Sequence, residues 1–155
     1  MISRASVLFV CLGNICRSPM AEGAMRVAAR EAGLDLLVDS AGTGGWHIGS
    51  PPDSRAIATA KAMGVDISDL RARQVERSDF HRFTHIFALD GQNLADLRRL
   101  QPGDAAAELS LLLDMVPGRE GQAVADPYYG EDDGFAVAWR DVSTAAEMLA
   151  QRLGV

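Results

Sequence analysis

Four short apolar runs divide the chain and set the strongest limit on its fold. The runs are SVLFV at 6–10, LLVDSA at 36–41, HIFAL at 85–89 and LSLLL at 109–113. They alternate with segments whose apolar residues recur at the three- and four-residue spacing of helices. Short buried strands that alternate with helices form parallel β-α-β units with right-handed connections. The pattern therefore predicts an α/β fold.

The helical segments have recognisable ends. In the first, Ser18 suits an N-cap, Pro19 suits the first turn, and Gly33 suits a C-terminal stop. The other helices are expected at 51–64, where two prolines open and a glycine closes the segment, after LDGQN at 89–93, and at about 133–153. We find no linker, repeat or low-complexity segment, and we expect one domain over residues 1–155.

The composition supports one ordinary core and argues against several partners. The chain has 155 residues, 48% of them hydrophobic, and a net charge of −6. That charge disfavours a broad attraction to nucleic acid or to an anionic membrane. No run approaches the roughly 18 apolar residues of a spanning helix, and the first residues lack a secretory pattern. We expect a cytoplasmic protein without nucleic-acid or membrane partners.

The segment CLGNICRS, residues 11–18, joins the first apolar run to the first helix. Ligands of open α/β sheets bind at the carboxyl ends of strands, and a helix N-terminus favours an anion such as phosphate. Gly13 and Asn14 tolerate the left-handed conformations that would turn the loop amides inward. Arg17 can hold two phosphate oxygens with one guanidinium. The segment therefore predicts a phosphate cradle.

Cys11 is the candidate nucleophile of this cradle. Positive surroundings favour its thiolate, and the Ser18 hydroxyl can add to that effect. A free cysteine is more often a small buried hydrophobe, so the inference depends on the whole Cys-x5-Arg-Ser spacing. The loop lacks the lysine of a nucleotide P-loop, and two cysteines without nearby histidines do not complete a zinc site. We expect neither a metal nor a cofactor.

The stretch VCLGNICRSPMAEG, residues 10–23, resembles the signature of the low-molecular-weight protein tyrosine phosphatases. Further blocks in the family's order are SAGTGGWHIGSPPDSRA at 40–56, ARQV at 72–75, LDGQNLADL at 89–97 and DPYYG at 126–130. The resemblance implies a single three-layer domain, with a four-stranded parallel sheet flanked by helices on both faces. It also implies a metal-independent phosphomonoesterase with a phosphocysteine intermediate.

The resemblance also assigns roles by matching position. Cys11 corresponds to the nucleophile, Arg17 to the residue that holds the phosphoryl oxygens, and Asp126 to the general acid. By its own pattern, Asp126 before Pro127 is typical of a turn, and only the family register indicates catalysis. The implied substrate-binding residues are Leu12, Gly13, Asn14, Ile15, Cys16 and Ser18 in the loop, and Trp46, Tyr128 and Tyr129 at the pocket entrance.

The resemblance extends to regulation and partners. It suggests a reversible Cys11–Cys16 disulfide that protects the nucleophile, with a buried filler role for Cys16 as the alternative. The implied partners are a phosphotyrosine-containing protein, with a tyrosine kinase among the candidates, and phosphate or vanadate in the loop. We expect a monomer or a weak dimer. His47, His81 and His85 receive no chemical role.

Three alternative functions use a similar loop. Related arsenate reductases need two further cysteines for a disulfide relay, and this chain has none after Cys16. Relatives that hydrolyse phosphoarginine carry threonine at the position of Ile15, whose larger apolar side chain favours phosphotyrosine. A non-catalytic phosphotyrosine-binding module would need neither Cys11 nor Asp126. Some family members also have a histidine at the position of Leu70, so one supporting hydrogen bond is in question here.

Overall fold

The structure is a computed structural model that describes residues 5–128, 130 and 133–154. The elements in chain order are β1 (Ser6–Cys11), α1 (Arg17–Glu31), β2 (Leu37–Gly42), α2 (Ser54–Ala62), α3 (Asp79–Arg82), β3 (His85–Ala88), α4 (Gly91–Leu100), β4 (Glu108–Leu111), the 3-10 helix η1 (Leu112–Met115) and α5 (Asp133–Leu153). The strands form one parallel sheet in the order β2-β1-β3-β4. The predicted four-stranded α/β architecture is confirmed.

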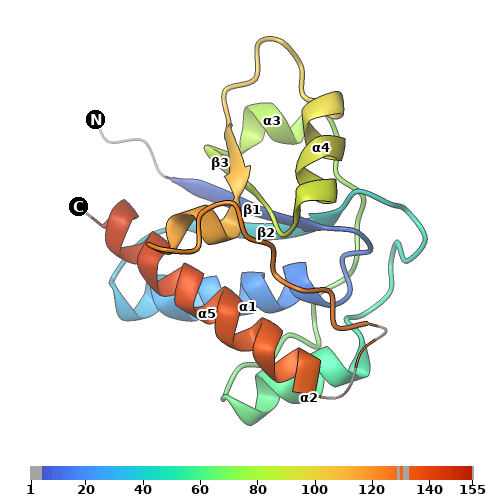
Figure 1. Cartoon of the computed structure of the whole chain (residues 1–155), viewed down its shortest axis with the longest axis vertical. Coiled ribbons are helices and arrows are strands. Elements are labelled where there is room, and N and C mark those ends of the chain that lie inside the picture. The colour runs from blue at the N-terminus through green and yellow to red at the C-terminus, as the bar shows by residue number, and fades with distance from the viewer. Residues whose placement is uncertain (1–4, 129, 131–132, 155) are drawn as a thin grey trace.

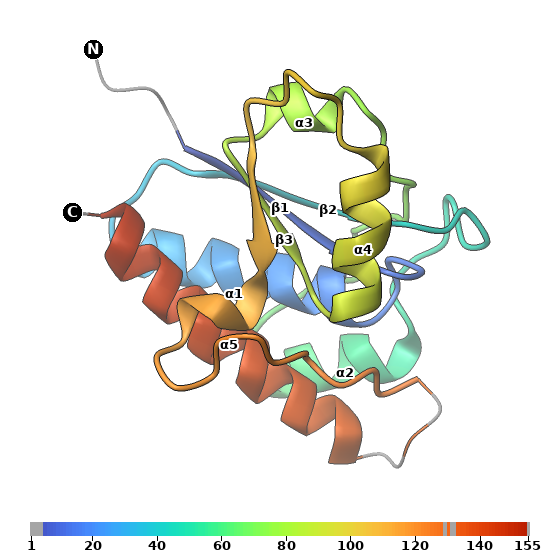
Figure 2. The same ribbon diagram turned by 45° about the horizontal axis from the view of Figure 1, so that its top comes forward.

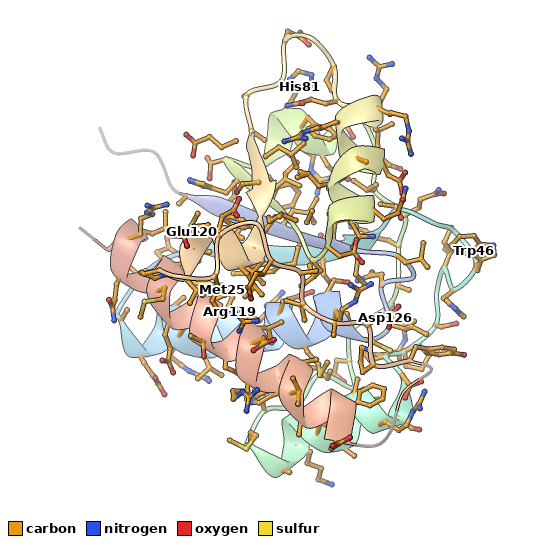
Figure 3. All side chains as sticks on the ribbon, viewed as in Figure 1. Met25, Trp46, His81, Arg119, Glu120 and Asp126 are labelled. Carbon is orange, nitrogen blue, oxygen red and sulfur yellow. The ribbon has the colours of Figure 1, made fainter. Side chains whose placement is uncertain are left out.

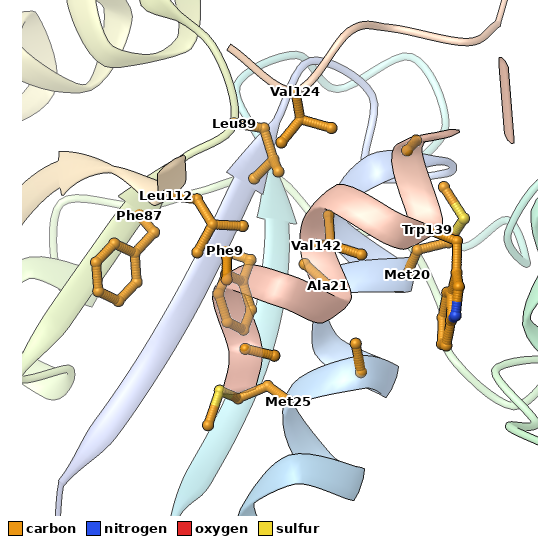
Figure 4. Close-up of a cluster of buried hydrophobic side chains, with 14 of the residues drawn as sticks. Phe9, Met20, Ala21, Met25, Phe87, Leu89, Leu112, Val124, Trp139 and Val142 are labelled. Atoms are coloured by element: carbon orange, nitrogen blue, oxygen red, sulfur yellow. The ribbon is translucent and has the colours of Figure 1, made fainter. Parts of the chain in front are cut away.

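Helices cover both faces of this sheet (Figures 1 and 2). On one face α1 and α5 pack together, with α2 against them, while α3 and α4 lie on the other. The central strand β1 feeds both layers because successive side chains of a strand point to opposite faces. Val7 and Phe9 join the apolar cluster beneath α1 and α5 (Figure 4), whereas Leu8 and Val10 join the one beneath α3 and α4.

The strand order predicts a crevice at the carboxyl ends of the strands. From β1 the chain passes to β2 on one side, and later returns to β3 on the other side of β1. In open α/β sheets such a reversal of strand order leaves a ligand crevice at the carboxyl ends of the strands. Cys11 ends β1, and Asp90 follows β3 by two residues. Residues far apart in sequence therefore meet at this edge.

The first helix starts earlier than its sequence predicts. Its N-cap is Cys16 instead of Ser18, and Ser18 lies buried in the first turn. The serine hydroxyl is engaged with the loop itself, so it is not available as a cap. The predicted stop is confirmed, because Gly33 has a φ of 71° and the Leu34 amide donates to the Ala29 carbonyl at 2.8 Å.

Other boundaries differ by a few residues. The prolines at 51 and 52 precede α2, because Asp53 is the N-cap and accepts from the Arg55 amide at 2.8 Å. The apolar run predicted as a strand over 109–113 divides into β4 and η1. Leu112 and Leu113 are both 1% exposed, so the run stays apolar after the strand has ended. The short helix α3 has no counterpart among the predicted elements.

Candidate active site

A pocket of about 400 Å³ lies at the carboxyl end of β1 and brings the three predicted catalytic residues together. Cys11 ends β1, Arg17 begins α1, and Asp126 lies in the segment before α5. The other lining residues are Leu12, Gly13, Ile15, Cys16, Trp46, His47 and Tyr128. Figure 3 shows Trp46 and Asp126 on the same side of the molecule. Tyr129 lies outside the described residues.

The Cys11 thiol contacts a buried hydroxyl group of its own loop. Its Sγ lies 3.0 Å from Ser18 Oγ, and Asn14 Nδ2 donates to the same oxygen at 2.7 Å. Because Asn14 occupies a lone pair of the serine oxygen, the hydroxyl proton can point to the sulfur. A donor in that position stabilises a thiolate. Ser18 is completely buried and Asn14 is 3% exposed, so both support the loop from beneath the pocket.

Asn14 fixes the curl of the loop. Its φ of 58° is the only positive value among the described non-glycine residues, in a region that asparagine tolerates. Besides Ser18, its Nδ2 donates to Ser40 Oγ at 3.0 Å, and its Oδ1 accepts from the Arg73 amide at 3.0 Å. One buried side chain thus ties the loop to β2 and to the segment after α2. The left-handed conformation that the sequence allows at Asn14 is present and is held by these side-chain hydrogen bonds.

A buried carboxylate that was not predicted extends this network. Ser40 Oγ donates to Glu22 Oε1 at 2.7 Å, and Arg26 Nε donates to Glu22 Oε2 at 3.1 Å. Burial raises the pKa of Glu22 above its ordinary range, while the bonds from Ser40 and Arg26 oppose the rise. Leu70 packs against the apolar cluster beneath α1. The leucine side chain has no polar atom, so it cannot make the supporting hydrogen bond that was in question at this position.

Arg17 is buried and anchored by residues from two other segments. Its Nη1 donates to Asp90 Oδ2 at 2.7 Å and to the Val124 carbonyl at 3.0 Å, while Nη2 lies 3.5 Å from Asp126 Oδ2. Burial opposes the charge of Arg17, but Cys11 and the bond to Asp90 outweigh it and raise its pKa. Asp90 was not predicted as a site residue, although an aspartate shortly after a parallel strand could have indicated it.

Asp126 is held less tightly. Its Oδ1 accepts from the Tyr128 amide at 3.0 Å, which closes a short turn at Pro127. The carboxyl is 39% exposed, whereas the Arg17 side chain is only 3% exposed. The second carboxylate oxygen faces Arg17 and the pocket. Asp126 can therefore reach both a bound phosphoryl group and solvent.

The two cysteines are free thiols in different surroundings. Burial raises the pKa of Cys16 to about 12, and the nearby Asp53 carboxylate adds to the rise. Cys16 is therefore protonated at neutral pH. It also lacks the contact with Ser18 that Cys11 makes. This difference favours Cys11 as the nucleophile.

His47 is a pocket residue that the sequence did not single out. A side chain on Gly13 would place its Cβ 3.0 Å from the His47 ring, so the imidazole lies directly on the loop backbone. The other two histidines are away from the pocket and pair with Asp104 and Glu108. His47 follows β2 by five residues, and a histidine at such a place in the sequence gives no local signal that it lines the pocket.

Neither a cluster of metal-binding side chains nor a membrane-spanning helix occurs among the described residues. Within 5–128, 130 and 133–154, no group of three or more histidine, cysteine, aspartate or glutamate side chains is placed to hold a metal ion. Over the same ranges, no helix has the length and hydropathy needed to cross a membrane.

Known proteins share both the sequence and this fold. The model of the family described as low molecular weight phosphotyrosine protein phosphatase matches residues 6–155. A Schizosaccharomyces pombe protein of that name is 44% identical over 138 residues, 87% of this chain and 88% of the relative. The crystal structure of YfkJ from Bacillus subtilis superposes with a TM-score of 0.90 at 39% identity, covering 98% and 96% of the two chains.

A further solved structure widens the range of named activities. The crystal structure of DARP, the drosophila arginine phosphatase, superposes with a TM-score of 0.89 at 32% identity. It covers 95% of this chain and 96% of the other. The match of the family model over residues 6–155, together with the extent of these similarities, leads to one conclusion. The chain belongs to the low molecular weight phosphotyrosine protein phosphatase family, whose members are phosphoric monoester hydrolases.

Proposed function

We propose that this protein hydrolyses phosphotyrosine and small aryl phosphates through a phosphocysteine intermediate on Cys11. The observation that carries the proposal is that Cys11, Arg17 and Asp126 line one pocket at the switch point of the sheet. Arg17 supplies positive charge, Cys11 a nucleophilic sulfur and Asp126 a proton donor, which are the groups that displacement at phosphorus requires. The loop and Arg17 supply the donors, so the reaction needs no metal ion.

In the first step the Cys11 thiolate attacks phosphorus, and an S–P bond forms as the P–O bond to the aryl group breaks. The electron pair of that bond goes to the aryl oxygen, and Asp126 donates a proton to it. The tyrosine phenolate is a poor leaving group because its conjugate acid, the tyrosine phenol, has a pKa of about 10. Protonation by Asp126 removes that obstacle.

In the second step water attacks the phosphocysteine. Asp126, now a carboxylate, accepts a proton from the water as its oxygen bonds to phosphorus. The S–P bond breaks, inorganic phosphate leaves, and the Cys11 thiolate is regenerated with Ser18 as its donor. Both steps pass through loose transition states with charge spread over three oxygens, which Arg17 and the loop amides stabilise by position.

The pocket walls support an aryl substrate. Ile15, Tyr128 and Trp46 line the pocket, and Trp46 is 72% exposed. Flat apolar walls suit a phenyl ring. The arginine phosphatase DARP shares the fold, so the fold cannot separate the two substrates. Ile15 favours phosphotyrosine because its apolar surface offers no partner to a guanidinium.

The proposal extends to the partner and to redox control. The substrate is a phosphotyrosine-containing protein, with a tyrosine kinase among the candidates.

A peroxide can oxidise the Cys11 thiolate to a sulfenic acid, which the Cys16 thiol attacks to form a disulfide with loss of water. Both thiols line the pocket. Free thiols of this kind suit a reducing compartment such as the cytoplasm.

The test measures turnover of p-nitrophenyl phosphate in the presence of a chelator. We expect hydrolysis, inhibition by vanadate, and loss of turnover in Cys11→Ser. Brief mixing with substrate and acid quenching should trap a protein heavier by one phosphoryl group in the wild type and not in Cys11→Ser. Full turnover by a correctly folded Cys11→Ser protein would exclude the mechanism.

A second assay separates the two substrate classes. Peptides that differ only in phosphotyrosine or phosphoarginine are compared by kcat/KM with the same enzyme. We expect the phosphotyrosine peptide to be preferred, and Ile15→Thr to narrow the difference. A preference for phosphoarginine in the wild type would reassign the substrate while leaving the roles of Cys11 and Arg17 in place.

A further inference from the structure

Arg55, in the first turn of α2, is not part of the pocket wall, yet it holds the segment that carries Asp126. Its Nη2 donates to the Tyr128 carbonyl at 3.2 Å. The guanidinium carbon also lies 5.5 Å from the centre of the Tyr128 ring and 4.6 Å from that of Phe135, at the start of α5. The Arg55 guanidinium thus makes three contacts, two with Tyr128 and one with Phe135.

The Tyr128 backbone links these contacts to the carboxyl group. Its amide donates to Asp126 Oδ1 at 3.0 Å, while its carbonyl accepts from Arg55. A shift of this residue would move Asp126 as well, since a two-residue turn joins them. The Asp126 carboxyl is 39% exposed and has few other restraints among the described residues. Arg55 therefore restrains the segment at the residue that orients the acid.

Asp53 fixes the guanidinium in turn. Its Oδ1 accepts from Arg55 Nε at 3.0 Å and its Oδ2 from Nη2 at 3.0 Å, a two-point arrangement that sets the plane of the group. The bond from Arg55 is also the main cause that lowers the pKa of Asp53. Only an arginine can bond both carboxylate oxygens and still reach a carbonyl.

The same aspartate is bonded to the phosphate cradle. The Asp53 amide donates to the Ile15 carbonyl at 2.8 Å. Asp53 therefore contacts the loop that carries the nucleophile, and Arg55 contacts the segment that carries the acid. The distance between the loop at 11–18 and the segment at 126–128 therefore depends on the Asp53–Arg55 ion pair. Proton transfer to a leaving oxygen is sensitive to displacements of about 1 Å.

We propose that Arg55, oriented by Asp53, is a positioning residue that sets Asp126 at the proton-transfer distance from the aryl oxygen. The inference rests on the proposed function, because it assigns a role relative to the general acid. Arg55 touches no reacting atom. Its loss impairs leaving-group protonation while the nucleophile, the cradle and Arg17 remain in place.

The experiment compares kcat/KM for phenyl phosphate, with a weakly acidic leaving group, and p-nitrophenyl phosphate, with a much more acidic one. The value of kcat/KM reports the first chemical step, in which the leaving group departs. The substrate ratio is the value for phenyl phosphate divided by the value for p-nitrophenyl phosphate. Loss of Arg55 in Arg55→Ala should lower the value for phenyl phosphate about tenfold and that for p-nitrophenyl phosphate about threefold or less. The KM for p-nitrophenyl phosphate should change little.

A double substitution gives the sharper readout. In an Asp126→Ala background, Arg55→Ala should change kcat/KM for either substrate by less than about twofold, because the group it positions is gone. Asp53→Asn keeps a good N-cap but weakens the hold on Arg55, so it should shift the substrate ratio in the same direction. Arg55→Lys should recover part of the loss.

Arg99→Ala is the matched control, since Arg99 is paired with Asp96 on α4, on the opposite side of the sheet. It should leave the substrate ratio unchanged. Equal slowing of both substrates by Arg55→Ala, or full additivity with Asp126→Ala, would overturn the positioning role. A higher KM for acidic phosphopeptides with an unchanged ratio would also overturn it, by placing Arg55 in contact with substrate.

These outcomes are separable from the proposed function. Loss of turnover in Cys11→Ser together with an unchanged ratio in Arg55→Ala would refute the positioning role alone. Turnover retained in Cys11→Ser would refute the proposed function itself. Thermal unfolding of Asp53→Asn and Arg55→Lys, compared with Arg99→Ala, identifies any loss of fold, and the ratio in the folded variants decides the question.

Discussion

The two sides of the pocket are built differently. The cradle side, residues 11–18, is held by buried side chains: Asn14, Arg17 and Ser18 are at most 3% exposed. The acid side, residues 126–128, is held by an exposed turn and by contacts from Arg17 and Arg55. In the proposed mechanism the nucleophile and the anion donors therefore lie on the buried side of the pocket, and the general acid lies on the more exposed side. Phosphate binding and proton transfer should accordingly respond to different substitutions.

The largest effect should come from Arg17→Lys on the cradle side. Lysine keeps the charge but cannot bond Asp90 and phosphoryl oxygens with one planar group. We expect kcat/KM for p-nitrophenyl phosphate to fall about 10³-fold, near the upper range for loss of a transition-state donor. Steady-state kinetics at several pH values measure it. A loss below tenfold would show that charge alone suffices and that the rigid geometry is unimportant.

Next in size is Asp126→Ala on the acid side. Removal of a general acid slows substrates with poor leaving groups by about 10²-fold or more, and those with good leaving groups much less. The free energy of unfolding should change by no more than about 0.5 kcal/mol, since the side chain is partly exposed. Phenyl and p-nitrophenyl phosphate kinetics with urea unfolding test both parts. Equal slowing of the two substrates would argue against Asp126 as the acid.

Asn14→Ala tests the rigidity of the cradle directly. It removes three hydrogen bonds and leaves an alanine at a φ of 58°. We expect the free energy of unfolding to drop by about 2 kcal/mol, and kcat/KM to fall about tenfold without dependence on the leaving group. Asn14→Gly, which relieves the backbone strain but not the lost bonds, is the matched control. A leaving-group-dependent loss would mean that the two sides are not independent.

The effect that is smallest at neutral pH concerns the two thiols within the cradle. The pKa of Cys16 is raised from 9.0 to about 12, so the folded state keeps it protonated where the unfolded state ionises. Its stabilising contribution is complete below pH 9 and is lost as the pH rises toward 12. The free energy of unfolding should decrease over that range, and less steeply in Cys16→Ala. Near pH 8, iodoacetamide should modify Cys11 first, as mass spectrometry can show.

The site was predicted unevenly. The residues of the loop could be proposed from the sequence because Cys-x5-Arg-Ser between a strand and a helix is a local pattern, and six residues of the loop line the pocket. Asp126 could be proposed only through the family register, since a local Asp-Pro pair indicates a turn. Asp90, His47 and Arg55 were missed. Each contacts a residue distant in sequence, and local sequence patterns do not report such contacts.

The sequence by itself determined the alternation of strands and helices, the parallel sheet and the location of the cradle. These follow from hydrophobic periodicity and from local backbone preferences, which depend on neighbours in the chain. Only the tertiary structure decided that Asp90 anchors Arg17, that Glu22 and Ser40 support Asn14, and that Arg55 restrains the acid segment. Parallel strands bring their carboxyl ends to one edge, but which side chains touch there depends on how the helices pack across the sheet.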